Sequence, residues 1–307
     1  MADSYMGFVG VTTGSSSIMK IFPAWADILG LPTRQLVGHD LPLTASTQDY
    51  RDLVTQIADD PHHLGALVTT HKINVFRAAG DLFDHIDEFG TTAGEISSIS
   101  KRKGQLVGHA KDGITAGLAL EEFLPSRQFA STGDTAPQVL CLGAGGAGLA
   151  LCWYLAQRSE RPALITVTDT DPARLDHLVE VLTAAGGADL IRPVLVRGLD
   201  DSARVLSELP AGSLVVNATG LGKDRPGSPL PDNATWPEGG LVWEFNYRGT
   251  LEFWHQARLA APSYDLTVVD GWRYFIHGWT QVIAEVFDLD LTPQLVDRLS
   301  EAARSSR

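Results

Sequence analysis

A β-rich apolar run at residues 138–142 breaks into glycines and then resumes as a second apolar stretch at residues 149–155. The order of strand, glycine turn and helix is typical of a loop that binds a nucleotide diphosphate. Gly143 and Gly145 allow the backbone to turn tightly and approach the diphosphate, and Gly148 allows the helix to pack closely on the strand. The N–H groups and the positive dipole end of that helix favour phosphate. The expected cofactor loop consists of Gly143, Ala144, Gly145, Gly146 and Ala147.

An acidic residue follows the next strand at the distance that dinucleotide binding requires. The β-branched run at residues 164–168 ends at Asp169, 21 residues after Gly148. A carboxylate at this position can accept hydrogen bonds from both ribose hydroxyls of an adenosine. The alternative is an ordinary glycine turn with a solvent-facing aspartate, which the matching context disfavours. Asn217 and Thr219, after a later strand, are expected to line the cofactor on its nicotinamide side.

The composition is that of a globular protein that acts on small molecules. The chain has 307 residues, 44% of them hydrophobic and 20% charged, and this length favours two domains. The net charge of −13 disfavours nucleic acid or an anionic membrane as a partner, because both would repel an acidic surface. No run of about 18 apolar residues occurs and residues 1–5 lack the features of an export signal, so we expect a cytoplasmic protein. Cys141 and Cys152 lie in apolar surroundings and are expected to be buried thiols, neither a disulfide nor a metal pair.

The runs after the glycine loop predict a doubly wound parallel sheet. Four further strand-like runs follow the first two strands, each separated from the next by a stretch of crossover length. These runs are residues 191–196, 213–216, 241–245 and 266–269. We predict a Rossmann dinucleotide-binding domain of residues 116–274. The helix from about residue 274 to 287 comes after the sheet is complete and is expected to return to the first domain.

The residues before the loop predict an α/β domain of their own. Strand-like runs occur at residues 8–11 and 66–69, and apolar residues at helical spacing mark a helix over residues 18–29. Residues 95–109 predict a hairpin with a basic turn, whose charges we expect to be solvated. The fold class is therefore α/β, with a substrate domain of residues 1–115 on which C-terminal helices of residues 275–307 pack back.

Two ionisable side chains of the first domain are candidates for acid–base chemistry. A nicotinamide-dependent reaction needs a proton donor or acceptor beside the carbon that exchanges hydride. Lys72 follows the strand-like run at residues 66–69, and Asp112 follows the hairpin. Both would lie at strand ends, where clefts form in α/β proteins. The sequence alone does not pair them, and a surface lysine with a turn aspartate is the alternative.

The ordered motifs resemble those of the shikimate/quinate dehydrogenase family over essentially the full length. They are Ser15 and Ser17, Lys72, the hairpin at 94–98, Asp112-Gly113, the loop at 143–148, residues 217–222 and residues 271–275. By this resemblance Lys72 would exchange the proton, while Asp112 would orient the ammonium group and bond a neighbouring substrate hydroxyl. The substrate-binding residues that the resemblance implies are Ser15, Ser17, Thr69, Ser97, Tyr247 and Tyr274. Gly220 and Gly271 would join the cofactor-binding residues.

Several amide side chains of the family pattern are absent from this chain. The replacements are Ala66-Leu67-Val68 for Asn-Val-Thr, Thr70 for proline, Ser97-Ser98 and Ala110-Lys111 for two Asn-Thr pairs, Ile21-Phe22 for His-Asn and Gly278 for glutamine. A buried hydroxyl that lacks its partner costs about 1–3 kcal/mol, so these losses would lower the affinity for shikimate itself by orders of magnitude.

Structural roles are the alternative for several of these residues. Ser15 and Ser17 could cap the helix that follows them, since serine is a preferred cap. Tyr247 could pack its ring within a loop without facing a substrate. The sequence does not decide between substrate binding and a structural role for three nearby histidines, namely His71, His109 and His277.

The residues after the second strand favour NAD over NADP. NADP-using relatives typically have Asn-Arg-Thr there, with the arginine on the 2′-phosphate, whereas this chain has Asp169-Thr170-Asp171. Two carboxylates would repel a phosphate dianion, while Asp169 can accept from the ribose hydroxyls. Arg174, about one helical turn later, is the nearby cation that could restore NADP binding. We predict NAD.

The sequence therefore predicts an NAD-dependent alcohol dehydrogenase of the shikimate/quinate type. It would interconvert a secondary alcohol and a ketone on a small alicyclic hydroxy acid. Two alternatives stay open: a dehydrogenase of a different cyclitol or aminocyclitol ring, and a non-catalytic NAD-binding regulatory protein. We expect a monomer or homodimer with a small-molecule substrate, and no metal, nucleic-acid or membrane partner.

Overall fold

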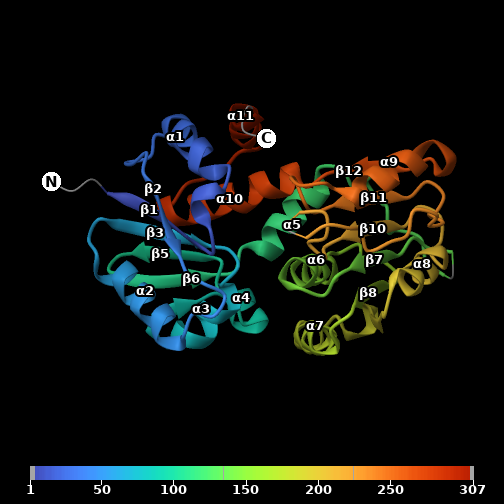
Figure 1. Ribbon diagram of the computed structural model, residues 1–307, viewed down its shortest axis with the longest axis horizontal. Coiled ribbons are helices and arrows are strands. Elements are labelled where there is room, and N and C mark those ends of the chain that lie inside the picture. The colour runs from blue at the N-terminus through green and yellow to red at the C-terminus, as the bar shows by residue number, and fades with distance from the viewer. Residues whose placement is uncertain (1–3, 134, 224, 305–307) are drawn as a thin grey trace. The chain divides into compact units, whose positions relative to one another are not determined.

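The computed structural model describes residues 4–133, 135–223 and 225–304. The chain divides into two compact units, the first of Met1–Lys111 with Ile276–Arg307 and the second of Asp112–Phe275. Each unit has its own sheet and its own helices (Figure 1). The α/β fold class predicted from the sequence is confirmed.

A mixed six-stranded sheet forms the first unit, in the order β2-β1-β3-β5-β6-β4. The strands are β1 (Tyr5–Gly10), β2 (Leu36–Asp40), β3 (His63–Val68), β4 (His85–Ile86), β5 (Ser98–Arg102) and β6 (Gln105–His109). β1 is parallel to β2 and β3, whereas β5 is antiparallel to both β3 and β6. The carboxyl ends of β3 and β6 therefore lie at the same edge of this sheet.

Helices cover both faces of the first sheet (Figure 1). They are α1 (Ile18–Leu29), α2 (Thr47–Asp59), α3 (Lys72–Ala79), α4 (Glu88–Ala93), α10 (Trp272–Phe287, from Ile276 onward in this unit) and α11 (Pro293–Ala303), with 3-10 turns η1 (Thr13–Ser15) and η2 (Gly80–Leu82). Residues of α2 and α3 pack with Ile99 and Val9 in one core cluster. On the other face Phe8 meets Trp279 of α10 at 4.8 Å between ring centroids.

The apolar stripe that predicts the first helix is confirmed by α1. Its buried side chains are Ile18, Ile21, Phe22, Trp25 and Ala26, and the helix ends at Gly30, which adopts the left-handed conformation at φ +65°. The Trp25 indole donates to the Leu299 carbonyl of α11 at 2.8 Å. Residues at opposite ends of the chain thus form one layer of the first unit.

The basic hairpin turn differs from its prediction. The Lys101 ammonium donates to the Asp60 carbonyl at 2.8 Å, and the Arg102 guanidinium lies 2.8 Å from the Glu285 carboxylate. The solvated-charge interpretation therefore fails for Lys101 and Arg102, to which segments distant in sequence bring acceptors, whereas Lys103 is exposed as expected. β5 also begins at Ser98, three residues later than the predicted run.

An all-parallel sheet forms the second unit, in the order β12-β11-β10-β7-β8-β9. Its strands are β7 (Val139–Leu142), β8 (Ile165–Asp169), β9 (Ile191–Leu195), β10 (Leu214–Asn217), β11 (Leu241–Glu244) and β12 (Thr267–Val269). This strand order, which reverses beside β7, is the predicted doubly wound topology. Ligands of such sheets bind at the carboxyl ends of the strands near that reversal.

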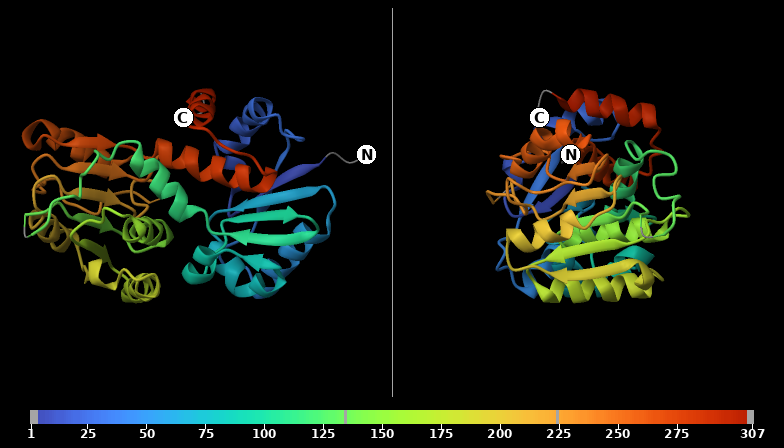
Figure 2. Two further views of the ribbon diagram at one scale, coloured as in Figure 1. Left: turned by 180° about the vertical axis from the view of Figure 1, so that it is seen from behind. Right: turned by 90° about the vertical axis from the view of Figure 1, so that its right-hand side faces the viewer.

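Helices also flank the second sheet on both faces (Figure 2). They are α5 (Asp112–Glu121), α6 (Gly146–Gln157), α7 (Pro172–Ala184), α8 (Leu199–Ser207) and α9 (Glu252–Tyr264), with the 3-10 turn η3 (Ala188–Leu190). Side chains of α8 and α9 pack on β7, β10 and β11 in one core cluster. Cys141 and Cys152 are free, buried thiols, as predicted.

Candidate functional site

Different geometric constraints explain the individual glycines of the loop between β7 and α6. Gly143 has φ +107°, and a Cβ there would lie 2.8 Å from the Ala218 backbone. A Cβ on Gly148 would lie 2.1 Å from the Gly143 carbonyl oxygen. The turn and packing roles predicted for these two glycines are confirmed. A Cβ on Gly145 would meet no atom within 4 Å, so this residue leaves space in front of the helix.

A cavity of about 580 Å³ opens at this loop within the second unit. Gly143 and Gly145 line it beside residues 168–171, and Thr219 and Arg225 line it from the loop after β10. The first N–H groups of α6 have no partner within the helix, because the first intrahelical bond runs from Leu149 N–H to the Gly145 carbonyl. The cavity therefore combines space, backbone donors and a helix N-terminus, which together suit a diphosphate.

Asp169 holds the glycine loop as well as facing the cavity. Its Oδ2 accepts from the Ala144 N–H at 2.8 Å, and its Oδ1 accepts from the Asp171 N–H at 2.9 Å. Arg174 lies 4.0 Å from Asp169 Oδ2 and 3.5 Å from the Asp171 carboxylate. The N–H of Ala144, one of the residues predicted to bind the cofactor, is thus bonded within the protein. The guanidinium of Arg174 is likewise engaged by both carboxylates.

Asn217 lies behind the cavity wall, whereas the sequence placed it in the wall. Its side chain is fully buried and donates from Nδ2 to Glu244 Oε2 at 2.7 Å. Its Oδ1 accepts from the Thr219 N–H at 3.1 Å and the Thr219 hydroxyl at 2.7 Å. The prediction of a direct contact was wrong for this side chain because β10 ends inside the core. Thr219, two residues later, does line the cavity.

Glu244 is a buried acid that the sequence analysis missed. It ends β11, has no exposed surface, and accepts from the Asn246 N–H at 2.8 Å as well as from Asn217. Burial raises the pKa of this carboxyl to about 7, although hydrogen bonds from Asn246 and Asn217 oppose the rise. An ionisable residue in the apolar run of residues 241–245 was the signal available in the sequence.

Four other predicted residues of the second unit have a backbone or packing role of their own. Gly220 has φ +74°, and a Cβ on Gly271 would lie 2.1 Å from the Phe245 carbonyl oxygen, so a close approach of backbone requires this glycine. The Tyr247 ring stacks on Phe275 at 4.1 Å between centroids. The Tyr274 ring packs on Phe245 at 4.6 Å. The packing alternative for Tyr247 therefore has direct support, and Tyr274 also belongs to an aromatic cluster.

Lys72 begins α3 at the carboxyl edge of the first sheet. Its N–H donates to the Thr69 carbonyl at 3.3 Å, and its carbonyl accepts from the Ile96 N–H at 3.1 Å. The Thr69 N–H donates to the Val9 carbonyl of β1 at 3.0 Å. Residues just after β3 and just before β5 thus fix the backbone from which the lysine side chain extends. Asp112, the other predicted catalytic residue, is the first residue of α5 and of the second unit.

His71, directly before Lys72, has a structural role. It is fully buried, with Nδ1 2.9 Å from the Tyr50 hydroxyl and Nε2 2.9 Å from the Leu41 carbonyl. A carbonyl only accepts, so Nε2 donates and Nδ1 accepts from the tyrosine. Both ring nitrogens are therefore occupied by the protein itself.

Ser15 and Ser17 do not cap α1 through their hydroxyl groups. The Ser15 hydroxyl donates to the Thr12 carbonyl at 2.9 Å, within the 3-10 turn η1. Ser17 is the residue before α1, and its side chain makes no cap hydrogen bond. The capping interpretation was wrong because Ser17 already has a helical backbone conformation. The same turn is held by Asp40, whose carboxylate accepts from the Thr13 N–H and hydroxyl at 2.8 and 2.6 Å.

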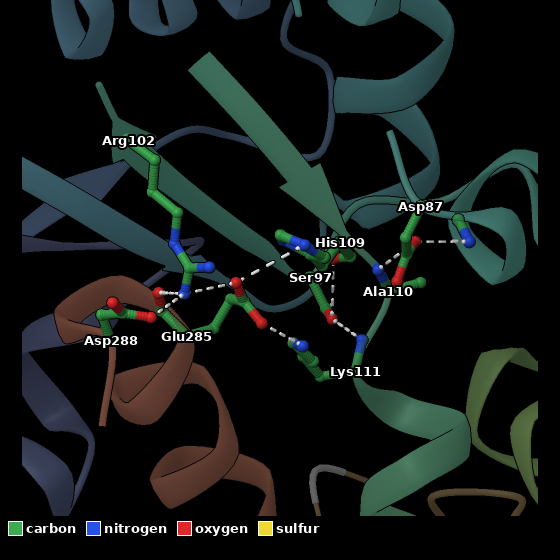
Figure 3. Close-up of polar contacts among 9 residues, drawn as sticks. Asp87, Ser97, Arg102, His109, Ala110, Lys111, Glu285 and Asp288 are labelled. Atoms are coloured by element: carbon green, nitrogen blue, oxygen red, sulfur yellow. Dashed lines mark hydrogen bonds and ion pairs between the residues drawn. The ribbon is translucent and has the colours of Figure 1, made fainter. Parts of the chain in front are cut away.

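The Ser97 side chain bonds to the backbone of the segment that precedes Asp112 (Figure 3). Its buried hydroxyl accepts from the Lys111 N–H at 2.7 Å and faces the His109 carbonyl at 3.4 Å. Asp87 accepts from the Ala110 N–H at 3.1 Å. The hydroxyl predicted to bind substrate is therefore used to hold residues 109–111 in place.

Glu285 of α10 gathers three basic side chains of the first unit (Figure 3). The Lys111 ammonium bonds its Oε2, Arg102 lies 2.8 Å from its Oε1 and His109 lies 3.5 Å from the same oxygen. Burial opposes ionisation of Glu285, but the Lys111 hydrogen bond and charge, with His109 and Arg102, lower the pKa of the carboxyl. Burial lowers the pKa of His109. In the sequence Lys111 is visible as a departure from the family pattern, but its partner Glu285 is not.

Among residues 4–133, 135–223 and 225–304, no group of three or more His, Cys, Asp or Glu side chains could hold a metal ion. Within the same part of the chain, every helix is too short or too polar to cross a membrane.

Comparison with known proteins identifies similar dehydrogenases. No protein-family model matches the sequence. The chain is 30% identical over 181 residues to the NAD(+) quinate/shikimate dehydrogenase of Corynebacterium glutamicum strain R, covering 58% of this chain and 56% of that protein. It is 27% identical over 175 residues to the NADP(+) shikimate dehydrogenase of Lactococcus lactis subsp. cremoris, covering 55% and 57%. The chain thus matches little more than half the length of these curated relatives.

Solved structures resemble the chain over nearly its full length. A quinate dehydrogenase from Corynebacterium glutamicum in complex with NAD gives a TM-score of 0.77 at 24% identity, covering 99% of both chains. A shikimate 5-dehydrogenase from Thermus thermophilus with shikimate gives 0.71 at 22%, covering 99% and 98%. The 5-ketofructose reductase of a Gluconobacter species gives 0.72 at 18%, covering 98% and 99%. These likenesses establish the fold, and the resemblance predicted from the motifs is confirmed.

Proposed function

For this divergent relative of the shikimate/quinate dehydrogenases, we propose an NAD-dependent oxidoreductase that interconverts a secondary alcohol and a ketone on a small alicyclic hydroxy acid. The observation that carries the proposal is the cavity at the glycine loop, where Gly145 leaves open space before the N-terminus of α6. The residues fit a dinucleotide: α6 offers backbone donors for the diphosphate, and Asp169 offers acceptors for a ribose. The bound cofactor would supply the hydride, which no side chain can provide.

The preference for NAD is supported by the charges around Asp169. Asp169 and Asp171 engage Arg174 at 4.0 and 3.5 Å, so this guanidinium would have to leave two carboxylates to reach a 2′-phosphate. Asp169 also keeps acceptor capacity for ribose hydroxyls beyond the two N–H bonds that it already accepts, because a carboxylate has about four lone-pair sites. We therefore propose that NADP is the poorer cofactor.

For the proton transfer we propose Lys72 and Asp112. The lysine ammonium, cationic at neutral pH, would stabilise the developing alkoxide and exchange its proton. The Asp112 carboxylate would orient that ammonium and accept from a substrate hydroxyl. The support is that Lys72 is fixed through both of its backbone polar groups, while Asp112 follows directly on the held segment of residues 109–111.

A second candidate is a dehydrogenase of a different cyclitol or aminocyclitol ring. One specific observation favours it: the Ser97 hydroxyl, which stands where the family has an amide, is buried and bonded to the Lys111 N–H. Ala66 and Ala110 likewise stand where the family has asparagines. A pocket with fewer amide groups would suit a ring with a different set of hydroxyls, since unmatched polar groups weaken binding.

A substrate screen tests the two candidates together. NADH formation from NAD would be followed across alicyclic hydroxy acids, including shikimate and quinate, and across neutral cyclitols and aminocyclitols. Turnover of a carboxylated ring supports the first candidate, and turnover restricted to uncharged or amino-substituted rings supports the second. NAD binding without turnover on any ring would favour the non-catalytic alternative.

The cofactor preference has its own test in the ratio of kcat/KM for NAD to that for NADP. We expect this ratio to exceed about 10 in the wild type and to fall about tenfold in Asp169→Asn, because the substitution removes a charge that repels phosphate. Asp189→Asn, an exposed aspartate outside the cavity, is the matched control and should leave the ratio unchanged. A wild type that prefers NADP would refute the charge argument.

A further inference from the structure

Glu244 is a buried carboxyl group that the proposed chemistry does not use. It lies behind the wall of the cavity, without exposed surface, at the end of β11. Each of its oxygens accepts from an uncharged N–H donor, Oε2 from Asn217 at 2.7 Å and Oε1 from Asn246 at 2.8 Å. A buried carboxylate held by uncharged donors is costly, so its position requires a physical reason.

Asn217 links the Glu244 carboxylate to the cavity wall through hydrogen bonds at both ends of its amide. Because a carboxylate only accepts, the amide must point Nδ2 at Glu244 and Oδ1 at Thr219. That Oδ1 accepts from both the N–H and the hydroxyl of Thr219, at 3.1 and 2.7 Å. The Thr219 oxygen in turn accepts from the Leu221 N–H at 3.2 Å. Both Thr219 and Leu221 line the cavity.

The other oxygen of Glu244 is connected to the same segment of the cavity wall through Asn246. Asn246, whose N–H it binds, donates from Nδ2 to the Leu221 carbonyl at 2.9 Å. The N–H and the carbonyl of Leu221 are therefore both held by side chains whose positions depend on Glu244. Two independent routes converge from one buried acid on one segment of the cavity wall.

We propose that Glu244 is a positioning residue that makes cofactor affinity depend on pH, because its ionised form holds residues 218–221 in the shape that receives the dinucleotide. A protonated Glu244 would present an O–H to one of two N–H donors. Rotation of the Asn217 amide would relieve that clash only by turning Nδ2 towards the Thr219 N–H, which then loses its acceptor. The inference rests on the proposed dinucleotide site.

Burial, more than neighbouring charge, places the titration of Glu244 in the physiological range. Burial raises its pKa to about 7 against the hydrogen bonds from Asn246 and Asn217, and the like charge of Glu252 at the start of α9 adds to the rise. The pKa of Glu252 itself is lowered, first by the Thr250 hydroxyl that donates to it, so Glu252 stays ionised in the same range. Protonation of the network near neutrality therefore falls on Glu244.

The test is the affinity of the full-length chain for NAD, measured calorimetrically between about pH 5.5 and about pH 8.5. The Kd of the wild type should rise about tenfold towards the acid end, as expected for one lost hydrogen bond. Glu244→Gln, of similar shape, should bind as weakly at every pH as the acid wild type, with less than about threefold variation. Glu208→Gln, an exposed carboxylate paired with Arg192 at 3.5 Å, is the matched control and should follow the wild type.

Several outcomes would overturn the inference. One is a wild-type Kd that does not change with pH, and another is a Glu244→Gln variant that keeps the full pH dependence. A third is loss of the pH dependence in His255→Asn, because that histidine on α9 acts on Glu252 and could titrate in the same range. If neither NAD nor NADP binds at any pH, both the proposed function and the inference are refuted. If NAD binds equally well at every pH, only the inference is refuted.

A stability measurement verifies that Glu244→Gln folds and reports on the same group. The pKa of Glu244 is raised to about 7 in the folded chain, so its contribution to stability is complete in acid and is lost as pH rises through that value. Urea unfolding should therefore show a smaller loss of stability between about pH 5 and about pH 8 for Glu244→Gln than for the wild type. Equal losses would contradict the assignment of this titration.

Discussion

The cavity at the glycine loop of the second unit and the carboxyl edge of the first sheet are built by different means. At the glycine loop the cavity is shaped by backbone, through Gly143 and Gly145 before the first turn of α6, whereas side-chain bonds such as that of Asn217 to Thr219 hold its wall after β10. At the edge of the first sheet, side-chain contacts define the site. Many of these side chains bond to other parts of the protein, as Ser97 does to the Lys111 N–H and Lys111 to Glu285. A backbone site is specified by local conformation, whereas a side-chain site depends on which partners the tertiary structure brings.

The largest effect is expected at Lys72. If it exchanges the proton, Lys72→Ala should lower kcat at least about 100-fold while the Kd for NAD stays unchanged. Lys20→Ala, an exposed lysine on α1, is the control and should keep wild-type turnover. Initial rates on the best substrate of the screen measure kcat. Near-normal turnover of Lys72→Ala would show that Lys72 does not exchange the proton.

A pair of glycine substitutions separates binding from packing in the second unit. Gly145→Val places its side chain where no protein atom lies within 4 Å, at an ordinary φ of −73°. It should raise the Kd for NAD about 10-fold to 100-fold and leave Tm unchanged, because it fills only ligand space. Gly148→Ala is the opposite case, since its Cβ would lie 2.1 Å from the Gly143 carbonyl oxygen, and should lower Tm. Equal Tm values for both would contradict the geometry.

Removal of Glu285 tests the charge cluster of the first unit. Glu285→Gln should lower the free energy of unfolding by about 2–3 kcal/mol at neutral pH, because three basic side chains lose their shared carboxylate. The pKa of Glu285 is lowered in the folded chain, so this stability exists above its unfolded pKa and disappears as pH falls through its folded pKa. The difference between variant and wild type in urea unfolding should therefore shrink in acid.

The control for the charge cluster is an exposed pair on α11. Glu301→Gln removes a carboxylate 2.9 Å from Arg304, where both side chains are about two-thirds exposed. Exposed pairs of this kind contribute about 0–1 kcal/mol. A loss as large in Glu301→Gln as in Glu285→Gln would show that burial does not strengthen the cluster.

The smallest effect sharpens the contrast at Ser97. Ser97→Ala should cost about 1 kcal/mol of stability through the lost bond to the Lys111 N–H and change KM less than about threefold. Urea unfolding and steady-state kinetics measure the two quantities, with Ser207→Ala on α8 as the control. A large rise in KM would instead show that Ser97 binds the substrate. The contrast between the two regions would then be weaker.

Local periodicity was enough to predict much of the fold. α1 occupies the residues whose apolar spacing predicted it, since its buried stripe is fixed by the 3.6-residue repeat. The order of parallel strands in the second unit also follows from the alternation of strands and crossovers. Partners were harder to predict. Asn217 was placed in the cavity wall and is buried behind it, because the depth at which a strand ends is set by its neighbours.

The sequence by itself determined where a glycine loop precedes the N-terminus of α6, because glycines and strand-to-helix spacing act over a few residues. It also determined the carboxylates of Asp169 and Asp171, on which the proposed preference for NAD rests. Only the tertiary structure decided that Ser97 is occupied, that Glu285 gathers Lys111, Arg102 and His109, and that Glu244 stands behind the cavity. These side chains meet through contacts between residues far apart in sequence, and the ionisation of each acid depends on the burial that such contacts create.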